Sequence, residues 1–123
     1  MHNKIKILHV DDEDDILETV KVILEKENYE VVSVKNGRDA LKEVKLDGFG
    51  LIILDIMMPD FSGWDLFGKI AQIKPGYKVI FLSVLELSKE RIFELKNAGV
   101  KDYIKKPFDM NDFLKRVKNA INS

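Results

Sequence analysis

Acidic residues end two apolar runs of this sequence. Asp55 follows the apolar residues 51–54, and Asp11 and Asp12 follow the apolar segment 5–10. Short apolar runs bounded by turn signals are typical of strands that are buried on both faces in a parallel sheet. Ligands of open α/β sheets bind at the carboxyl ends of the strands, so these three carboxylates should meet at one edge. Because like charges at short range repel one another, a cation is the natural way to hold them together.

A hydroxyl and an ammonium group are expected at the same edge. Ser83 closes the apolar residues 79–82, and Lys106 follows the segment 101–105 and precedes Pro107. Three carboxylates, a hydroxyl and a cation suit phosphoryl transfer to a carboxylate. Mg²⁺, or alternatively Mn²⁺, prefers such oxygen ligands. The charge of a transferring phosphoryl group spreads over its oxygens, which the metal, Lys106 and Ser83 would neutralise.

Alternating strand and helix patterns would position these residues. The expected strands are 5–10, 30–34, 51–55, 78–83 and 101–104, and the expected helices are 14–27, 37–45, 63–73, 89–98 and 110–121. The side chains predicted to cap helix N-termini are those of Asn36, Ser62, Ser88 and Asp109, and Gly99 should end the fourth helix. Such alternation predicts a parallel sheet with helices on both faces.

The number of units limits the topology. Five strand–helix units are too few for a (β/α)8 barrel, which needs about 250 residues. They fit a single-domain, doubly wound α/β sandwich of the flavodoxin-like kind, with its five parallel strands in the order 2-1-3-4-5. The switch point of that order lies between the first and third strands, which carry Asp11, Asp12 and Asp55. The strand order and the positions of the carboxylates therefore indicate the same site, at the carboxyl ends of the first and third strands.

Composition excludes several classes of protein. With 123 residues, 46% of them apolar and 33% charged, the chain should form one soluble globular domain. It has no cysteine, which excludes disulfides and thiolate metal sites and fits a reducing compartment.

No apolar run approaches the roughly 20 residues of a membrane helix. Residues 1–4 lead straight into a strand, so no signal peptide is expected. We therefore expect a cytoplasmic protein with no membrane partner. The net charge of −1 gives no case for direct nucleic-acid binding.

Four segments, each at a strand end, resemble the receiver domain of bacterial and archaeal response regulators, the CheY-like superfamily of two-component signalling. They are Asp11-Asp12-Glu13, residues 54–63, Leu82-Ser83 and residues 103–108. The resemblance runs nearly end to end. It implies one receiver domain over residues 1–123 with no output domain in this chain.

The resemblance also implies how the acidic site works. Asp55 would accept a phosphoryl group from the phosphohistidine of a histidine kinase or a histidine phosphotransfer protein. Asp12 would bind Mg²⁺ directly and Asp11 through water, while Met57 would supply a backbone carbonyl. The domain would be a switch rather than an enzyme, although it assists its own phosphorylation and dephosphorylation.

A conformational switch is implied as well. Ser83 would hydrogen-bond the phosphoryl group, Lys106 would pair with it, and Tyr103 would turn inward as Ser83 moves. The face made by the fourth helix, fifth strand and fifth helix would then repack and control a downstream protein or a fused output domain. A cis Lys106–Pro107 peptide bond is also expected from the family.

Two pairs of residues give finer expectations. Met57 and Leu85 occupy positions that flank the water path to the acyl phosphate in the resembled family, where polar residues often speed hydrolysis. Both are apolar here, which predicts slow self-dephosphorylation. Asp102 and Arg116 match a dimer contact of transcriptional regulators, so a phosphorylation-dependent homodimer is one expectation. The alternative is that both side chains simply face solvent.

Other interpretations compete with the phosphoreceiver. The fold could serve as an interaction module that works without phosphorylation. A phosphatase of the haloacid dehalogenase type needs a second aspartate where Met57 stands, and a flavin carrier needs a loop rich in Ser, Thr or Gly after the first strand. Asp11 and Asp12 could merely start a helix. His9 has no nearby histidine, so we expect a buried, hydrogen-bonded side chain rather than a metal ligand.

Overall fold

Strands and helices alternate strictly along the chain. The computed structural model describes residues 4–123. The elements are β1 (Lys6–Val10), α1 (Asp14–Lys26), β2 (Glu30–Val34), α2 (Gly37–Leu46), β3 (Phe49–Leu54), α3 (Gly63–Ile73), β4 (Val79–Ser83), α4 (Lys89–Asn97), β5 (Val100–Lys105) and α5 (Met110–Ile121). Each boundary lies within two residues of the one predicted. Residues 1–3, which belong to the segment 1–4 on which the expectation of no signal peptide rests, lie outside the described residues.

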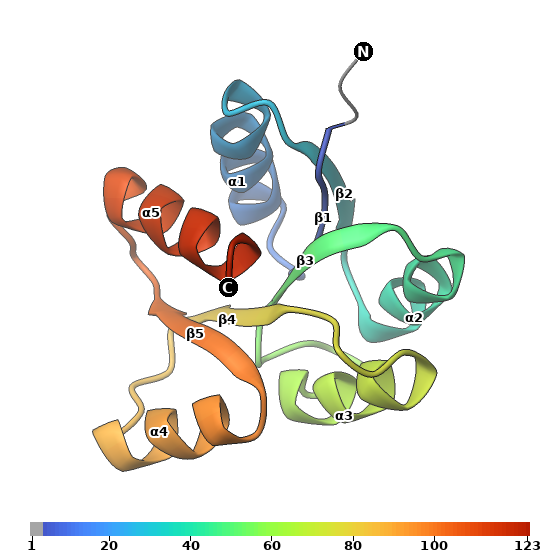
Figure 1. Cartoon of the computed structure of the whole chain (residues 1–123), viewed down its shortest axis with the longest axis vertical. Coiled ribbons are helices and arrows are strands. Elements are labelled where there is room, and N and C mark those ends of the chain that lie inside the picture. The colour runs from blue at the N-terminus through green and yellow to red at the C-terminus, as the bar shows by residue number, and fades with distance from the viewer. Residues whose placement is uncertain (1–3) are drawn as a thin grey trace.

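The five strands form one parallel sheet in the order β2-β1-β3-β4-β5, as predicted (Figure 1). Val10 pairs with Leu54 at the ends of the two central strands. Asp11 and Asp55, which follow these residues, therefore leave the sheet side by side. Ser83 pairs with Lys105 in the same way, so Lys106 leaves the sheet beside the end of β4.

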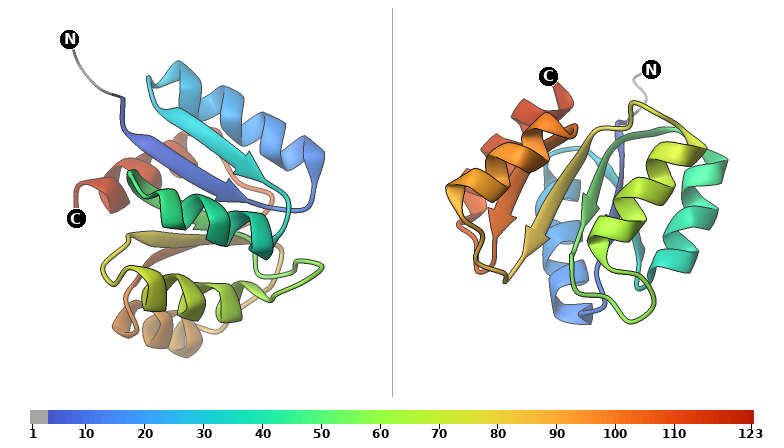
Figure 2. Two further views of the ribbon diagram at one scale, coloured as in Figure 1. Left: turned by 90° about the vertical axis from the view of Figure 1, so that its right-hand side faces the viewer. Right: turned by 90° about the horizontal axis from the view of Figure 1, so that it is seen from below.

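Helices cover both faces of the sheet, which thus forms the middle of three layers (Figure 2). Helices α1 and α5 pack on one face, where Val20, Leu24, Phe113 and Val117 meet the strand residues Ile7, Leu51, Ile53, Ile80 and Leu82. Helices α2, α3 and α4 pack on the other, where Ala40, Val44, Leu66, Ile70 and Leu95 meet Leu8, Val10, Ile52, Leu54 and Phe81. Side chains alternate between the faces of a strand, so continuous apolar runs supply both cores.

The predicted helix ends are confirmed. The side chains that accept a backbone N–H of the first turn are Asn36, Ser62, Ser88 and Asp109. Gly99 follows α4 with a φ of 108°, a conformation that favours glycine. Helix α1 is the exception, because its N-cap Glu13 makes no side-chain capping bond. That carboxylate is thus free to act elsewhere.

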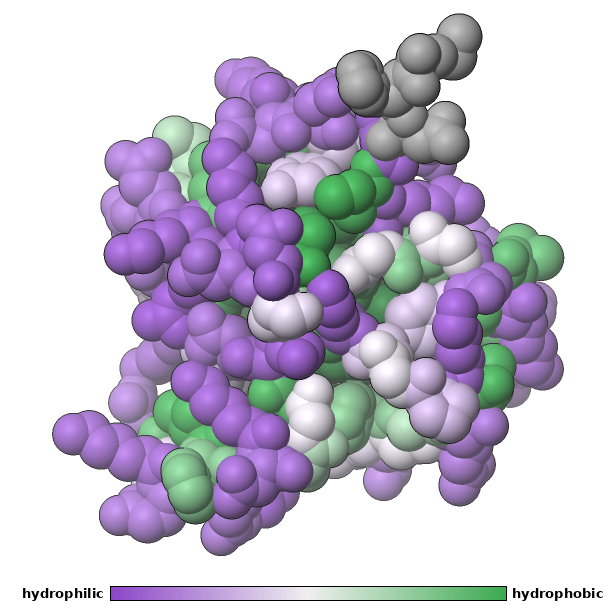
Figure 3. Space-filling model, in the orientation of Figure 1, coloured by the Kyte–Doolittle hydropathy of each residue, from purple (hydrophilic) through white to green (hydrophobic). Residues whose placement is uncertain are grey.

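The surface is mostly polar on the face drawn in Figure 3, where hydrophobic side chains gather only in small groups between hydrophilic ones. Within residues 4–123, no helix has the length and apolar character needed to span a bilayer.

Candidate functional site

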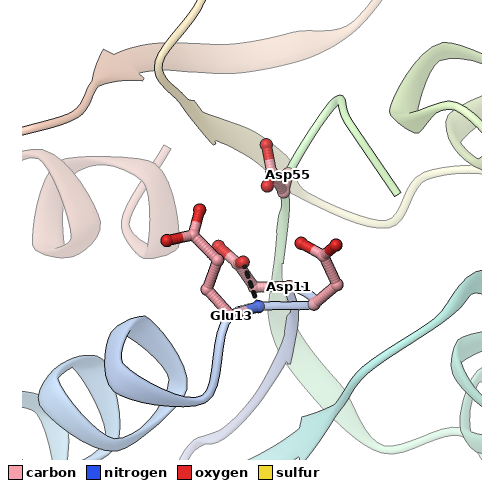
Figure 4. A group of neighbouring side chains, drawn as sticks. Asp11, Glu13 and Asp55 are labelled. Carbon is pink, nitrogen blue, oxygen red and sulfur yellow. Dashed lines mark hydrogen bonds between the residues drawn. The ribbon is translucent and has the colours of Figure 1, made fainter. Parts of the chain in front are cut away.

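Four carboxylates converge at the carboxyl ends of β1 and β3. Asp11, Asp12, Glu13 and Asp55 each offer an oxygen, and these oxygens lie within 4.8 Å of one another. Figure 4 shows Asp11 and Glu13 on the segment after β1, with Asp55 facing them from the end of β3. The predicted convergence of Asp11, Asp12 and Asp55 is confirmed. Glu13 is an addition, and its position directly after the acidic pair was the signal in the sequence that could have found it.

Backbone hydrogen bonds hold this arrangement. The Asp55 N–H donates to the Val10 carbonyl at 2.9 Å, which extends the β1–β3 pairing by one residue. The Glu13 N–H donates to Asp11 Oδ1 at 3.0 Å, and the Met57 N–H donates to Asp55 Oδ1 at 3.4 Å. Asp11 and Asp55 are thereby kept buried, whereas Asp12 and Glu13 remain exposed at the mouth of the site.

Lys106 reaches into the acidic group from the end of β5. Its Nζ lies 2.7 Å from Asp11 Oδ2, 3.4 Å from Asp55 Oδ2 and 3.6 Å from Glu13 Oε1. Its backbone N–H donates to the Ser83 carbonyl at 2.8 Å, and the expected cis bond to Pro107 is present. The side chain is 5% exposed. A buried lysine in contact with three carboxylates is an ion-pair hub rather than a surface residue.

The four carboxylates and Lys106 together carry more negative than positive charge. Burial raises the pKa of the Asp11 carboxyl even though Lys106 favours the charged form. Burial also opposes the charge of Lys106, but its carboxylate neighbours outweigh this effect and raise the pKa of the lysine above its usual value. Within residues 4–123, the four carboxylates have one lysine among them, Lys106, which contacts three of them. This oxygen donor set fits a hard divalent cation such as Mg²⁺ or Mn²⁺.

Ser83 and Tyr103 lie beside the β4–α4 loop. Ser83 is buried, and its Oγ accepts the Leu85 N–H at 3.4 Å. The Tyr103 ring is buried, and its hydroxyl donates to the Leu85 carbonyl. Burial of the phenol raises the pKa of Tyr103. The two predicted switch residues are thus linked through the backbone of Leu85.

The two apolar positions expected near the acyl phosphate differ in exposure. Met57 is 56% exposed on the loop after β3, whereas Leu85 is half-buried. Neither side chain offers a hydrogen-bonding group that could orient a water molecule strongly.

The expectation for His9 is wrong in one respect. The side chain is fully buried in β1, but within residues 4–123 neither ring nitrogen has a hydrogen-bond partner. Its register neighbours are Ser33 on β2 and Ile53 on β3, and its Nε2 stays 3.9 Å from Asp11 Oδ2. Burial, with the nearby charge of Lys106, lowers the pKa of His9 to about 3. The imidazole is therefore neutral at physiological pH.

Asp102 and Arg116 pair with each other within the chain. Arg116 Nη1 lies 3.0 Å from Asp102 Oδ1, and its Nε lies 2.9 Å from Asp112 Oδ2. Both side chains are partly exposed. In a dimer, either residue could contact the partner only if the Asp102–Arg116 pair were shared with it or broken. The homodimer stays a prediction.

Known proteins are similar to this chain over nearly its whole length. The family model for the response regulator receiver domain matches residues 7–118. The response regulator SaeR of Staphylococcus epidermidis is 36% identical over 115 residues, which cover 94% of this chain and 49% of that protein. The chain thus spans about half the length of the curated relatives it matches.

Solved receiver structures are also similar. The CheY-like receiver domain protein from Methanospirillum hungatei has a TM-score of 0.88 at 34% identity, with 98% of this chain and 95% of that chain covered. The response regulator TrrA of Thermotoga maritima, solved in complex with Mg²⁺-BeF, has a TM-score of 0.81 at 34% identity and covers 94% and 98% of the two chains.

Proposed function

The chain belongs to the response regulator receiver domain family, and from that premise we propose that Asp55 is the phosphoacceptor of a two-component phosphorelay. The observation that carries the proposal is the buried Asp55 carboxylate, which sits among three other carboxylates with Lys106 Nζ 3.4 Å from its Oδ2. A carboxylate in this setting offers a nucleophilic oxygen. The adjacent Lys106 ammonium can pair with the negative charge of the incoming phosphoryl group.

The donor would be a phosphohistidine of a histidine kinase or a histidine phosphotransfer protein. A carboxylate oxygen of Asp55 attacks phosphorus, the P–N bond to the imidazole breaks, and the released imidazole nitrogen keeps its electron pair. Asp12, Asp11, Asp55 and the Met57 carbonyl would hold Mg²⁺, which supplies neutralisation of the phosphoryl oxygens when bound. Lys106 is already buried beside the acids, so its ammonium can pair with the new charge with little reorganisation.

The response would pass through Ser83 and Tyr103. Ser83 would turn its hydroxyl toward the phosphoryl oxygens, which breaks its bond with the Leu85 N–H. The Leu85 carbonyl, which accepts from Tyr103, would shift with the same loop. The α4–β5–α5 face would then change its packing and control a downstream protein or a fused output domain.

The wider biology follows the same proposal. The domain would act as a switch that assists its own phosphorylation and dephosphorylation rather than as an enzyme with an external product. A cytoplasmic location and the absence of direct contact with nucleic acid or membrane stay predictions from the sequence.

The test is intact-mass analysis of the purified protein after incubation with acetyl phosphate and MgCl₂. We expect one added phosphoryl group, lost on treatment with hydroxylamine because an acyl phosphate is a reactive mixed anhydride. No addition should occur with a chelator in place of the metal. A folded protein that gains no mass and binds no Mg²⁺ would instead act as a phosphorylation-independent interaction module.

The acyl phosphate should hydrolyse slowly, because Met57 and Leu85 cannot orient a water molecule. The double variant Met57→Asn with Leu85→Glu is expected to speed hydrolysis by about tenfold, less than a fully positioned general base provides. Decay of the phosphorylated mass after removal of the donor measures the rate. Met110→Asn with Leu46→Glu, the same changes at exposed positions outside the site, should leave the rate unchanged. Equal rates for wild type and the site variant would contradict the expectation.

A further inference from the structure

The carboxylate of Asp60 ties the loop after β3 to the start of α2. Its Oδ1 accepts the N–H groups of Gly37 and Phe61, and its Oδ2 accepts that of Arg38, each at 2.9 Å. Gly37 is the first residue of α2, 23 positions before Asp60. Although burial opposes its charge, these three donors lower the pKa of the Asp60 carboxyl.

Asp60 and Asn36 together complete the N-terminus of α2. The first N–H groups of a helix have no partner within the helix. Here Asp60 accepts those of Gly37 and Arg38, and Asn36 Oδ1 accepts that of Asp39 at 2.8 Å. The positive end of the helix dipole also favours the Asp60 charge. This attachment is therefore specific in geometry and charge.

Phe61 closes the same contact. A Cβ built on Gly37 would lie 2.3 Å from Phe61 Cδ2, so only glycine lets the ring approach α2 this closely. The Lys69 ammonium lies 5.0 Å from the centre of the Phe61 ring. Polar and apolar contacts thus fasten the loop at two successive residues.

The segment between the two fixed points is very short. At its sheet end, the Gly63 N–H donates to the Ile56 carbonyl at 2.7 Å. At its tip, Asp60 is fixed to α2. Only Met57, Met58 and Pro59 lie between Ile56 and Asp60. The backbone of Met57 is therefore held from both sides, although its side chain is exposed.

We infer that Asp60 is a positioning residue for the cation site. Its hydrogen bonds with the first residues of α2 hold the Met57 backbone so that the Met57 carbonyl can bind Mg²⁺. The inference rests on the proposed function, in which that carbonyl is a ligand. Groups that orient metal ligands without touching the metal commonly change metal affinity by about 10–100-fold. Asp60 would act in this way through the peptide backbone.

Titration of MgCl₂ into ¹⁵N-labelled protein, followed by the backbone amides of residues 55–60, measures the affinity of the folded molecule. We expect Asp60→Ala to bind Mg²⁺ about tenfold more weakly than wild type. Asp60→Asn keeps an acceptor for the Gly37 N–H but loses the one for the Arg38 N–H. Its affinity for Mg²⁺ should therefore lie between those of Asp60→Ala and wild type. Asp65→Asn, an exposed charge change on α3, controls for the lost charge and should shift the affinity by less than about twofold.

Gly37→Ala perturbs the same contact from the α2 side without any change of charge, and it should also weaken Mg²⁺ binding. Faster amide exchange at residues 37 and 38 in the metal-free Asp60 variants would report the broken attachment. If the variants only melt at lower temperature and bind Mg²⁺ like wild type, Asp60 is a structural cap and the inference is overturned. A wild type that binds no Mg²⁺ would instead contradict the proposed function itself.

Discussion

Asp55→Asn is expected to abolish phosphoryl uptake from acetyl phosphate. The amide has nearly the shape of the carboxylate but no anionic oxygen to attack phosphorus. The contact of Lys106 with Asp11 at 2.7 Å does not involve Asp55, so the fold should persist. Intact mass measured beside wild type gives the result, and circular dichroism checks the fold.

The control for this result is Asp15→Asn, the same change at an exposed acid in the first turn of α1, outside the four-carboxylate group. Asp15→Asn should gain a phosphoryl group to the same extent as wild type. Asp12 and Glu13 bring competing carboxylate oxygens to the same group. Undiminished uptake by Asp55→Asn would therefore assign the acceptor to another acid and contradict the proposal.

Lys106→Met should have the largest effect on stability. Its ammonium group is the counter-ion of the buried Asp11 and Asp55 carboxylates. Removing one partner of a buried ion pair costs about 3–5 kcal/mol, because the remaining charge is left uncompensated. Urea unfolding at neutral pH in the presence of a chelator measures this loss of unfolding free energy. Lys105→Met, the exposed neighbour that pairs with Glu86, should lose no more than about 1 kcal/mol.

The loss in Lys106→Met should depend on pH and on metal. The pKa of Asp11 is already raised by burial, and loss of the lysine raises it further. A folded carboxyl with a raised pKa binds more protons than the unfolded one, so stability falls as pH rises toward the folded pKa. The deficit should thus be smaller near about pH 5 than at neutral pH. Mg²⁺ should restore part of it by replacing the lost charge. Equal losses in Lys106→Met and Lys105→Met would contradict this view of the site.

The strand ends were predictable because the apolar pattern is strong and local. Every residue of the segments 51–54 and 79–82 is buried, so the patterns identified central strands of a parallel sheet. Once the strand order was set, the carboxyl ends of β1 and β3 had to adjoin. The meeting of Asp11, Asp12 and Asp55 follows from that order.

Side-chain partners were harder to predict because they depend on packing between distant parts of the chain. No local pattern indicates that Lys106 lies closer to Asp11, 95 positions away, than to Asp55. Glu13 is the N-cap residue of α1, yet its side chain makes no capping bond and its carboxylate lies in the acidic group. His9 was expected to find a hydrogen-bond partner, yet β1 places it between two strands where residues 4–123 offer none.

The sequence by itself determined the fold, the edge at which the site lies and the chemical character of the site. Periodicity and residue type specify these, since each strand or helix is encoded over a few consecutive residues. Only the tertiary structure decided how the site is held: which carboxylate Lys106 contacts most closely, and that Asp60 reaches back to α2. Such contacts depend on side-chain directions and on the exact approach of two elements, which no local pattern encodes.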